Sequence, residues 1–388
     1  MNVLLIGGTG VLSSAVAKEA LLRGIKVTMI NRGLHTRVLP YNVELIKADK
    51  KNYTYIKRTL QGRTFDAVMD FLCISEKDIA DSFSLYKDFT KQYFFISSCA
   101  VYDTSKGGVC CEASPKALPI WEYSVTKWES EQHLIQLAKN TNVHYTVIRP
   151  CVTYGDTRIP YGIAPKYGYH WTLAARILAG KPIIRWNKGV NRCNMTHVHD
   201  FAVGVVGLIG NPKAFNEAFN VCGEETPSFN DVLEVMADYL NKTPIYFDLT
   251  SEEYAEEIPH RKGELLGGRS IDAINSNEKI KSAVPEFTQS IHLKEGVRKT
   301  LDAYKEQNYQ CGIDWTFDAD TDRIIAKFCK KKGLNASQYK IGFVDYLGNA
   351  TKSERLAYWL EFNKNILAIR CIKSGMSLLQ RIERKLQK

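Results

Sequence analysis

Short apolar runs and helix-like stretches alternate along the first part of the chain. Residues 2–6 (NVLLI) form a continuous apolar run, glycines follow at once, and a helix-like stretch at 11–23 ends at Gly24. A continuous apolar run is typical of a strand that is buried on both faces. The run KVTMI at 26–30 then completes a strand–helix–strand unit at the N-terminus.

The same alternation continues to about residue 150. The pattern predicts further strands at 43–47, 65–71, 93–97 and 144–148, and helices at 52–60, 76–88 and 122–139. Strands that alternate with helices form a parallel sheet with helices on both faces. We therefore expect an α/β fold with a doubly wound parallel sheet, and we assign its first domain to residues 1–150.

The pattern changes after Arg149 and Pro150. Residues 154–170 are rich in Tyr, Gly and Pro without a clean period, which indicates a loop or lid over a pocket. Helices are predicted later at 171–180, 197–209 and 228–241, and a strand at 218–223. We expect a smaller α+β domain at 151–193 and 224–305, with residues 194–223 returning to the first domain.

Residues 310–388 are predicted to form a basic helical C-terminal extension, which begins near a boundary at 308–320. Residues 361–388 carry seven Lys or Arg and two Glu. Their apolar positions recur at spacings of three and four, a helical stripe that is broken only by Gly375. Two interpretations stay open: a helix docked on the body or on another subunit, and a basic amphipathic helix on an anionic membrane.

Composition narrows the class of protein. The 388 residues are 45% hydrophobic and 24% charged, which are ordinary globular values, and the formal charge of +10 suits anionic ligands such as nucleotides. Ten cysteines are scattered without a CxxC pair, so we expect a reduced, cytoplasmic protein without a metal site. The N-terminus lacks the features of a signal peptide, and no apolar stretch approaches the roughly 20 residues that span a bilayer.

The first turn reads Gly7-Gly8-Thr9-Gly10, directly after a strand and before a helix. Glycines at such a turn let the backbone approach a pyrophosphate, and the free N–H groups of the helix start bind that anion. We therefore predict that Gly7, Gly10, Val11 and Leu12 contact a dinucleotide. Ser13 replaces the third glycine of the usual spacing, and as a small residue it should leave binding intact.

The end of the second predicted strand bears on the choice between NAD and NADP. An acidic residue usually stands there for the ribose 2′-hydroxyl of NAD, whereas this chain has Asn31 and Arg32. Arg32 can pair with the 2′-phosphate of NADP, so we favour NADP slightly; an exposed Arg32 that stacks on adenine keeps NAD open. Asp49 is predicted either to contact the adenine amino group or to cap its loop.

Three residue types in order along the chain indicate redox chemistry. The fifth strand ends at Ser97-Ser98, and Tyr123 and Lys127 follow at i and i+4 on one face of a predicted helix. A Tyr hydroxyl with a pKa of about 10 is a poor base, but a neighbouring ammonium lowers that value. Tyr123 could then take a proton from a substrate hydroxyl while Ser98 hydrogen-bonds the same oxygen, and Lys127 could also hold the ribose.

At this point the chain resembles the extended short-chain dehydrogenases/reductases, within the NAD-dependent epimerase/dehydratase group. The matching stretches cover about residues 1–305: IGGTGVLS at 6–13, FISSCAVY at 95–102, YSVTK at 123–127, IRPCVTYGD at 148–156, MTHVHDFA at 195–202 and DAINSNEKI at 272–280. The resemblance implies a Rossmann domain for the dinucleotide and a smaller domain for a nucleotide-sugar. It gives catalytic roles to Ser98, Tyr123 and Lys127, and it places Ser97 and Pro150 beside the cofactor.

Departures from the family pattern narrow the reaction that the resemblance implies. Ser98 is followed by Cys99-Ala100 instead of the Asp-Glu pair of 4,6-dehydratases, so dehydration is disfavoured. Many epimerases hold the diphosphate with an Arg four residues before the histidine of the "HV" segment, where this chain has Cys193. Candidates for that role are Arg158, Arg176 and Arg192, each of which could equally be a solvated surface residue. His197 itself is expected to be structural.

Three functions follow from these residues. The leading prediction is a nucleotide-sugar epimerase that oxidises a sugar hydroxyl to a ketone and reduces it on the other face. The second is an NADPH-dependent reductase of a keto-sugar or another small carbonyl compound. The third is a non-catalytic dinucleotide sensor or RNA-binding relative, which the complete Ser, Tyr and Lys set disfavours. A homodimer is expected by analogy, and peripheral membrane contact through the extension stays open.

Overall fold

The computed structural model describes residues 1–34, 42–308 and 312–370. Its main feature is a seven-stranded parallel sheet in the order β11-β7-β5-β4-β1-β2-β3. The strands are β1 (Asn2–Ile6), β2 (Lys26–Asn31), β3 (Glu44–Lys47), β4 (Ala67–Asp70), β5 (Gln92–Ile96), β7 (His144–Pro150) and β11 (Glu217–Val221). The strand order reverses between β1 and β4, where Rossmann-type sheets bind dinucleotides.

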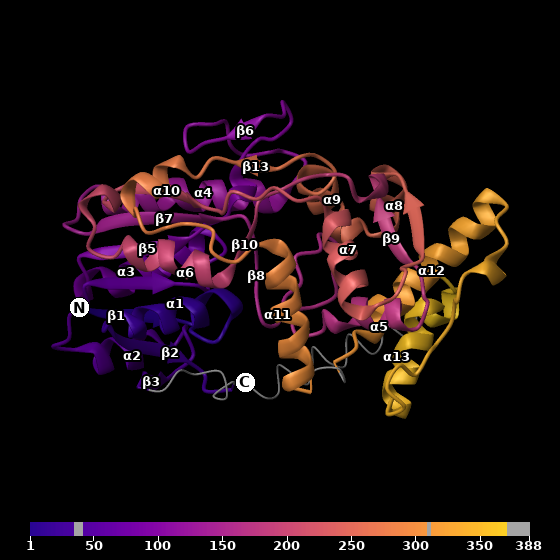
Figure 1. The fold of residues 1–388 in the computed structure, drawn as a ribbon. Helices are drawn as coiled ribbons and strands as arrows, with labels where there is room; N and C mark the ends of the chain where they lie inside the picture. Colours follow the sequence, from indigo (N-terminus) through magenta and orange to yellow (C-terminus); the bar gives the residue numbers. More distant parts are fainter. Residues whose placement is uncertain (35–41, 309–311, 371–388) are drawn as a thin grey trace. The chain divides into compact units, whose positions relative to one another are not determined.

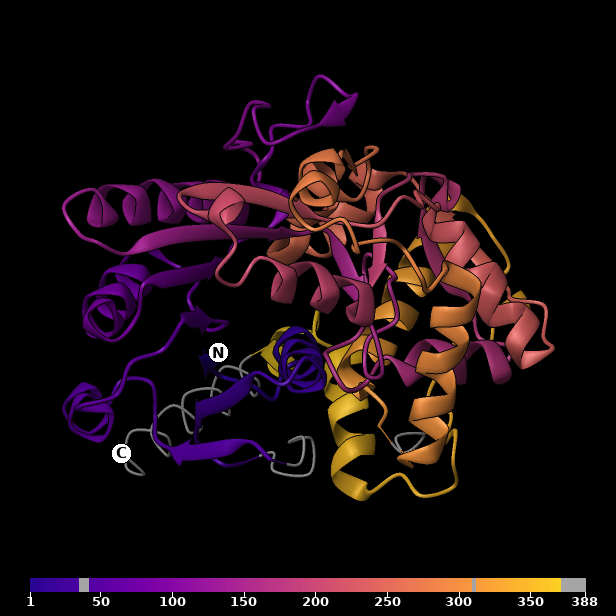
Figure 2. The same ribbon diagram turned by 60° about the vertical axis from the view of Figure 1, so that its left-hand side comes forward.

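Helices cover both faces of this sheet in both views (Figure 1, Figure 2). Because successive residues of a strand face opposite sides, Val3 and Leu5 of β1 pack in one core cluster, and Leu4 and Ile6 pack in another. The first cluster contains α1 (Val11–Leu22), α6 (Val198–Gly207) and α10 (Glu278–Ala283). The second contains α2 (Tyr53–Leu60), α3 (Glu76–Tyr86) and α4 (Glu122–Ala138).

The predicted fold class is confirmed. The apolar runs of the first 150 residues form strands within a few residues of their predicted bounds, and the helices lie between them as expected. Strand β11 comes from a later part of the chain and pairs in parallel with β7, from Glu217 beside Thr146 to Val221 beside Pro150. The sheet is therefore completed across a long sequence separation.

The chain forms two compact units. Unit 1 comprises 1–162, 189–232 and 251–300, and unit 2 comprises 163–188, 233–250 and 301–388. These bounds differ from the domain segments expected from composition, because 151–193 and 224–305 are shared between the units.

Smaller elements complete each unit. Unit 1 also contains the strand pairs β8 (Val152–Tyr154) with β10 (Met195–His197) and β6 (Val109–Cys110) with β13 (Ile274–Asn275). Its further helices are α8 (Ser251–Glu257) and α9 (Lys262–Gly268), and α7 (Phe229–Leu240) and α11 (Leu293–Glu306) each run from unit 1 into unit 2. Unit 2 contains β9 (Ile183–Trp186), β12 (Tyr246–Leu249), α5 (Trp171–Leu178), α12 (Trp315–Lys332) and α13 (Lys352–Phe362).

The C-terminal extension supplies much of unit 2. The expected boundary at 308–320 contains the start of α12, whose first turn is capped by Asp314: its carboxylate Oδ1 accepts the Phe317 N–H at 3.1 Å. The helix ends at Gly333, which has a φ of +64°. The extension therefore packs as part of this unit rather than following it as an appendage.

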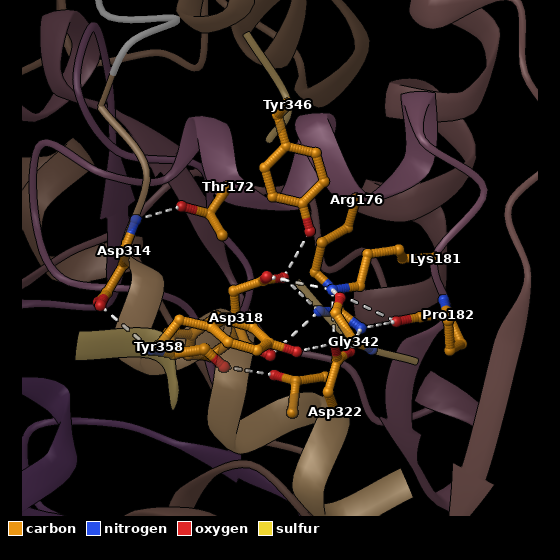
Figure 3. A network of polar contacts seen from close by, with 12 residues as sticks. Thr172, Arg176, Lys181, Pro182, Asp314, Asp318, Asp322, Gly342, Tyr346 and Tyr358 are labelled. Atoms are coloured by element: carbon orange, nitrogen blue, oxygen red, sulfur yellow. Dashed lines mark hydrogen bonds and ion pairs between the residues drawn. The ribbon is translucent and has the colours of Figure 1, made fainter. Parts of the chain in front are cut away.

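Four charged side chains with no exposed surface bind the extension to the rest of unit 2 (Figure 3). Arg176 of α5 pairs with Asp318 and, at 2.9 Å, with Asp322; Lys181 pairs with the same carboxylates at 3.1 and 2.5 Å. Tyr346 donates to Asp318 at 2.6 Å. Two cations balance two anions, and α12 supplies both anions.

The helical stripe predicted from residue 362 onward is wrong at its start. Helix α13 ends at Phe362, and a turn at 363–366 follows, in which Asn363 Nδ2 donates to the Trp359 carbonyl at 2.9 Å. Asn competes for backbone hydrogen bonds, which favours ending a helix. Residues 367–370 are helical again, and the rest of the stripe, residues 371–388 with Gly375, lies outside the described residues.

Candidate active site

The chain turns from β1 into α1 through Gly7, Gly8 and Gly10. Gly7 and Gly8 have φ values of +110° and +94°, which residues with a side chain rarely adopt. A Cβ on Gly8 would lie 2.4 Å from the sulfur of Met29, so a larger residue does not fit without a shift. The turn therefore presents bare backbone at the carboxyl edge of the sheet, as a pyrophosphate site requires.

Ser13 occupies the third position of the glycine pattern and is only 2% exposed. Its Oγ accepts the Gly10 N–H at 3.0 Å. The serine thus adds a hydrogen bond to the turn, and α1 still begins at Val11. The N–H groups of Val11 and Leu12 belong to the first turn of this helix, where no carbonyl of the same helix can accept them.

The end of β2 offers a cation and no carboxylate. Asn31 is used within the turn: its Nδ2 donates to the Gly7 carbonyl at 3.0 Å, and its Oδ1 accepts the Gly33 N–H at 2.8 Å. Arg32 is exposed, and no ion pair joins it to another residue of the described chain. Asp49 is exposed and accepts the Lys51 N–H at 2.9 Å, so it does cap its loop.

The two serines after β5 have different surroundings. Ser97 is buried, and its hydroxyl donates to Oε1 of Glu131 at 2.5 Å. Ser98 is half-buried, and its Oγ accepts the Ala100 N–H at 3.1 Å. Among the described residues none accepts the hydroxyl proton of Ser98. Ser97 therefore serves the interior, whereas Ser98 can donate to a bound molecule.

Tyr123 and Lys127 lie one turn apart on α4 but differ in exposure. Tyr123 is 38% exposed, whereas Lys127 is only 4% exposed. The Lys127 ammonium donates to the carbonyl oxygens of Cys73 at 2.9 Å and Ile96 at 3.1 Å, and it lies 5.9 Å from the centroid of the Tyr123 ring. A buried cation thus stands behind an accessible phenol, an arrangement that stabilises the phenolate.

Burial lowers the pKa of Lys127 to about 8, although nearby acidic groups oppose the change. The folded protein then binds fewer protons than the unfolded chain between about pH 8 and pH 10.5. Stability therefore rises with pH in this window. Relative to Lys127→Met, the wild-type protein should gain about 3 kcal/mol in the free energy of unfolding between these values. Urea unfolding of wild type and Lys127→Met across this pH range measures the gain. A difference in the free energy of unfolding that stays constant with pH would contradict the prediction.

A network of buried polar side chains connects helix α4 to the sheet beside this site. Glu131, one turn beyond Lys127, accepts two hydrogen bonds from Arg149, at 3.0 Å from Nε and 2.6 Å from Nη2. Arg149 Nη1 donates to the Tyr102 hydroxyl at 2.8 Å, and Tyr102 donates to Asn220 at 2.6 Å. The network joins α4 to β7, to β11 and to the segment that follows β5. Glu131 continues the spacing from Tyr123 and Lys127, but the network around it was not predicted from the sequence.

Pro150 and His197 occupy structural positions in unit 1. Pro150 ends β7, beside Val221 of β11. His197 is 6% exposed, and its Nδ1 accepts the His199 N–H at 3.3 Å at the start of α6. Burial lowers the pKa of His197. This backbone contact is the kind that a structural histidine makes.

Two of the arginines proposed for substrate have other uses. Arg176 has no exposed surface and is held by Asp318 and Asp322 within unit 2, so its prediction as a substrate ligand is wrong. The exposed Arg192 donates to the carbonyl and the hydroxyl of Thr226, at 2.8 and 2.7 Å. Neither contact was visible in the sequence, because each partner lies far along the chain.

Arg158 lies in an arginine-rich cluster of unit 1. Burial would raise the pKa of Glu264, but Arg269, Arg261 and Arg158 together lower it. Glu264 pairs with Arg261 at 2.8 Å and with Arg269 at 3.5 Å. Arg261 and Arg269 were not predicted from the sequence, although Arg269 stands just before the family-like segment at 272–280. Three guanidinium groups around one carboxylate suit an anionic ligand.

No group of three or more His, Cys, Asp or Glu that could hold a metal occurs among residues 1–34, 42–308 and 312–370. Within the same residues, no helix is both long and apolar enough to cross a membrane.

Comparisons with known proteins agree with these features. Residues 83–222 match the model of the NAD dependent epimerase/dehydratase family. The chain is 26% identical over 251 residues to the chloroplast stem-loop binding protein of 41 kDa b from Arabidopsis thaliana, covering 61% of this chain and 62% of that protein. It is 24% identical over 227 residues to UDP-glucose 4-epimerase from Vibrio cholerae, covering 56% and 64%. The chain thus spans less than two thirds of either relative.

Solved structures share the fold. UDP-glucuronic acid 4-epimerase from Bacillus cereus, in complex with NAD, is 18% identical with a TM-score of 0.63, covering 79% of this chain and 99% of that one. UDP-glucose 4-epimerase from Thermotoga maritima, with UDP-glucose, is 18% identical with a TM-score of 0.64, covering 79% and 100%.

The family match covers the segment that holds both serines after β5, Tyr123, Lys127 and Pro150. The glycine turn, the sheet order and this segment agree with one another. Residues 83–222 thus match the NAD dependent epimerase/dehydratase family, and the chain shares its fold with the solved UDP-sugar 4-epimerases.

Proposed function

We propose that this protein is an NAD(P)-dependent epimerase of a nucleotide-sugar, which works by transient oxidation of a sugar hydroxyl to a ketone. One observation carries the proposal: the accessible Tyr123 stands beside the buried Lys127 ammonium. Both belong to the unit whose sheet also carries the glycine turn. The pairing suits removal of a proton from an alcohol, the step that must accompany loss of a hydride.

Each residue of the site has a role in that step. Tyr123 takes the hydroxyl proton of the sugar and later returns it to the same oxygen. Lys127 stabilises the phenolate, and its two carbonyl partners hold the ammonium in place. Ser98 donates a hydrogen bond to the reacting oxygen. The dinucleotide, when bound, would accept the hydride and return it to the opposite face of the same carbon.

The residues at the carboxyl edge of the sheet fit a dinucleotide. Gly7 and Gly8 both have positive φ values, and a Cβ on Gly8 would lie 2.4 Å from the Met29 sulfur, so the turn is built from bare backbone, which suits a pyrophosphate. We propose pyrophosphate contacts for Gly7, Gly10, Val11 and Leu12, and an adenine contact for the carboxylate oxygen of Asp49 that does not cap the loop. We propose nicotinamide contacts for Lys127 and for the backbone of Ser97 and Pro150, because the Ser97 hydroxyl is bound to Glu131. We favour NADP, because Arg32 is an exposed cation and Asn31 is uncharged.

Replacing Arg32 should change the choice of cofactor. We expect Arg32→Ala to weaken NADPH binding by about tenfold and NADH binding much less, since one charge-assisted pair contributes about 1.5–3 kcal/mol. Titration of both dinucleotides into the two proteins measures this. As a control, Arg58→Ala removes an exposed arginine of α2. An equal loss for both dinucleotides would instead favour an adenine-stacking role.

The substrate class is proposed from charge and from relatives. The cluster of Arg158, Arg261 and Arg269 supplies cations for a diphosphate, with Arg192 as a further candidate. The epimerases that share the fold act on UDP-glucose or UDP-glucuronic acid by name. We also propose a homodimer, and the cytoplasmic location stays a prediction.

A reductase of a keto-sugar would use the same residues for a single hydride transfer, whereas an epimerase uses them for two. A second candidate is RNA binding, which the similarity to a stem-loop binding protein favours. The net charge of +10 also favours RNA binding, since contacts with phosphate groups depend on basic residues. The complete set of Ser98, Tyr123 and Lys127 favours the enzyme.

One experiment separates these functions. The protein is incubated with UDP-glucose or UDP-glucuronic acid and a trace of dinucleotide, and the sugars are resolved by chromatography. A new epimer without net change in dinucleotide supports the proposal. Consumption of NADPH by a keto-sugar would replace it with the reductase. No turnover, together with salt-dependent binding of an RNA hairpin, would replace it with RNA binding.

A further inference from the structure

Helix α13 and the residues after it expose large apolar side chains. The exposed fractions are 52% for Leu356, 50% for Trp359, 53% for Ile366 and 75% for Leu367. Exposed basic residues accompany them in the same segment. We name this set the cation–apolar face, and it comprises Lys352, Arg355, Leu356, Trp359, Ile366, Leu367 and Arg370.

The first half of the face is one stripe of a helix. Lys352, Arg355, Leu356 and Trp359 stand at i, i+3, i+4 and i+7, which places them along the same side of α13. The N-terminus of the helix is capped, because the Thr351 hydroxyl accepts the Glu354 N–H and Glu354 accepts the Thr351 N–H. Exposure of the stripe therefore reflects an ordered helix and not a frayed end.

Buried contacts hold α13 with this side outward. Tyr358 and Leu360 are 4% and 8% exposed. The Tyr358 hydroxyl donates to Asp322 at 2.5 Å, and Asp322 belongs to the buried charge network of Arg176 and Lys181 (Figure 3). Turning Leu356 and Trp359 inward would break that bond and leave a buried carboxylate short of a donor, which is costly.

The carboxylates of the segment are committed elsewhere. Glu354 caps its own helix, and Glu361 pairs with Lys364 at 2.8 Å. Arg355 pairs with Asp345 at 2.9 Å, but its side chain stays 54% exposed. The face is thus apolar with basic flanks. The sequence of 371–388, outside the described residues, adds five basic residues and one acidic residue.

We propose that the cation–apolar face binds the surface of an anionic phospholipid bilayer. Trp, Leu and Ile side chains suit the boundary between headgroups and acyl chains, and Lys and Arg attract anionic headgroups. A nucleic acid would use the basic and aromatic side chains but would leave the three aliphatic ones without apolar contact. The fold shared with the solved epimerases accounts for 79% of this chain and nearly all of theirs, so this chain has surface that they lack.

The test is co-sedimentation of the full chain with vesicles. We compare vesicles of phosphatidylcholine alone with vesicles that contain phosphatidylcholine and phosphatidylglycerol in similar amounts. We expect binding to the anionic vesicles only, weakened by added salt. The double variant Leu356→Ser/Trp359→Ser should bind at least about tenfold more weakly, since each apolar side chain loses its lipid contact. Lys352→Glu should weaken binding and leave the apolar stripe intact.

A matched control uses an exposed aliphatic residue of the same unit outside the face, Ile245→Ser, which should bind as wild type. Equal binding to both kinds of vesicle, or no binding to either, would overturn the proposal. So would unchanged binding by the double variant, which would assign membrane binding to another segment. A dimer in solution that Leu356→Ser/Trp359→Ser dissociates would show instead that a second copy covers the face.

Discussion

Tyr123→Phe is expected to lower kcat of the proposed epimerisation by about 10²- to 10⁴-fold, the usual contribution of one general acid–base group. The substitution removes only the phenolic oxygen, which in the proposed reaction accepts and returns the sugar proton. Because Tyr123 is 38% exposed, the free energy of unfolding should change by less than about 0.5 kcal/mol. Dinucleotide binding should also persist, since the glycine turn is untouched.

The measurement is a single-turnover and steady-state assay of wild type and variant with the same UDP-sugar. Tyr55→Phe is the matched control: Tyr55 is 37% exposed, belongs to α2 and should leave activity unchanged. A Tyr123→Phe protein that keeps wild-type activity would contradict the assignment of the base. A large loss in both variants would point to a general effect on folding.

The second large effect is expected in unit 2, on stability. Asp318→Asn removes one of two anions that balance Arg176 and Lys181, all without exposed surface. Breaking a buried ion pair by removing one partner costs about 3–5 kcal/mol, because the remaining charge has no compensation. Burial already lowers the pKa of Lys181, so loss of a carboxylate should lower it further.

Hydrogen exchange of α12 measures this effect locally, and thermal unfolding measures it for the whole chain. Asp248→Asn is the control, since it breaks the ion pair with Arg185, in which Asp248 is 39% exposed, and should cost less than about 1 kcal/mol. If the two variants lose similar stability, the buried network does not hold the extension in place.

Features that depend on residues close together in the sequence could be predicted from it. Strands such as 2–6 and 93–97 are continuous apolar runs, and the pattern alone shows burial on both faces. The glycine turn and the pair Tyr123 and Lys127 are likewise local, because four residues of a helix decide which side chains share a face. These elements were placed within a few residues of their observed bounds.

The interactions that were missed join distant residues. Arg176 looked like a ligand for a diphosphate, but its partners Asp318 and Asp322 lie 142 and 146 residues later. Likewise, Glu131 on α4 meets Arg149 only because β7 packs beside that helix in the fold. A side chain with an unpaired charge in a sequence motif can be a ligand or half of a buried pair, and only tertiary structure distinguishes the two.

The most direct test of the central claim examines the purified protein before any cofactor is added. The protein is denatured, and the released dinucleotide is identified and counted by chromatography. Our proposal predicts nearly one NADP or NAD per chain that dialysis does not remove, because an epimerase reuses the same dinucleotide in every cycle. A protein that is purified empty and then binds neither dinucleotide would contradict both the site and the function proposed for it.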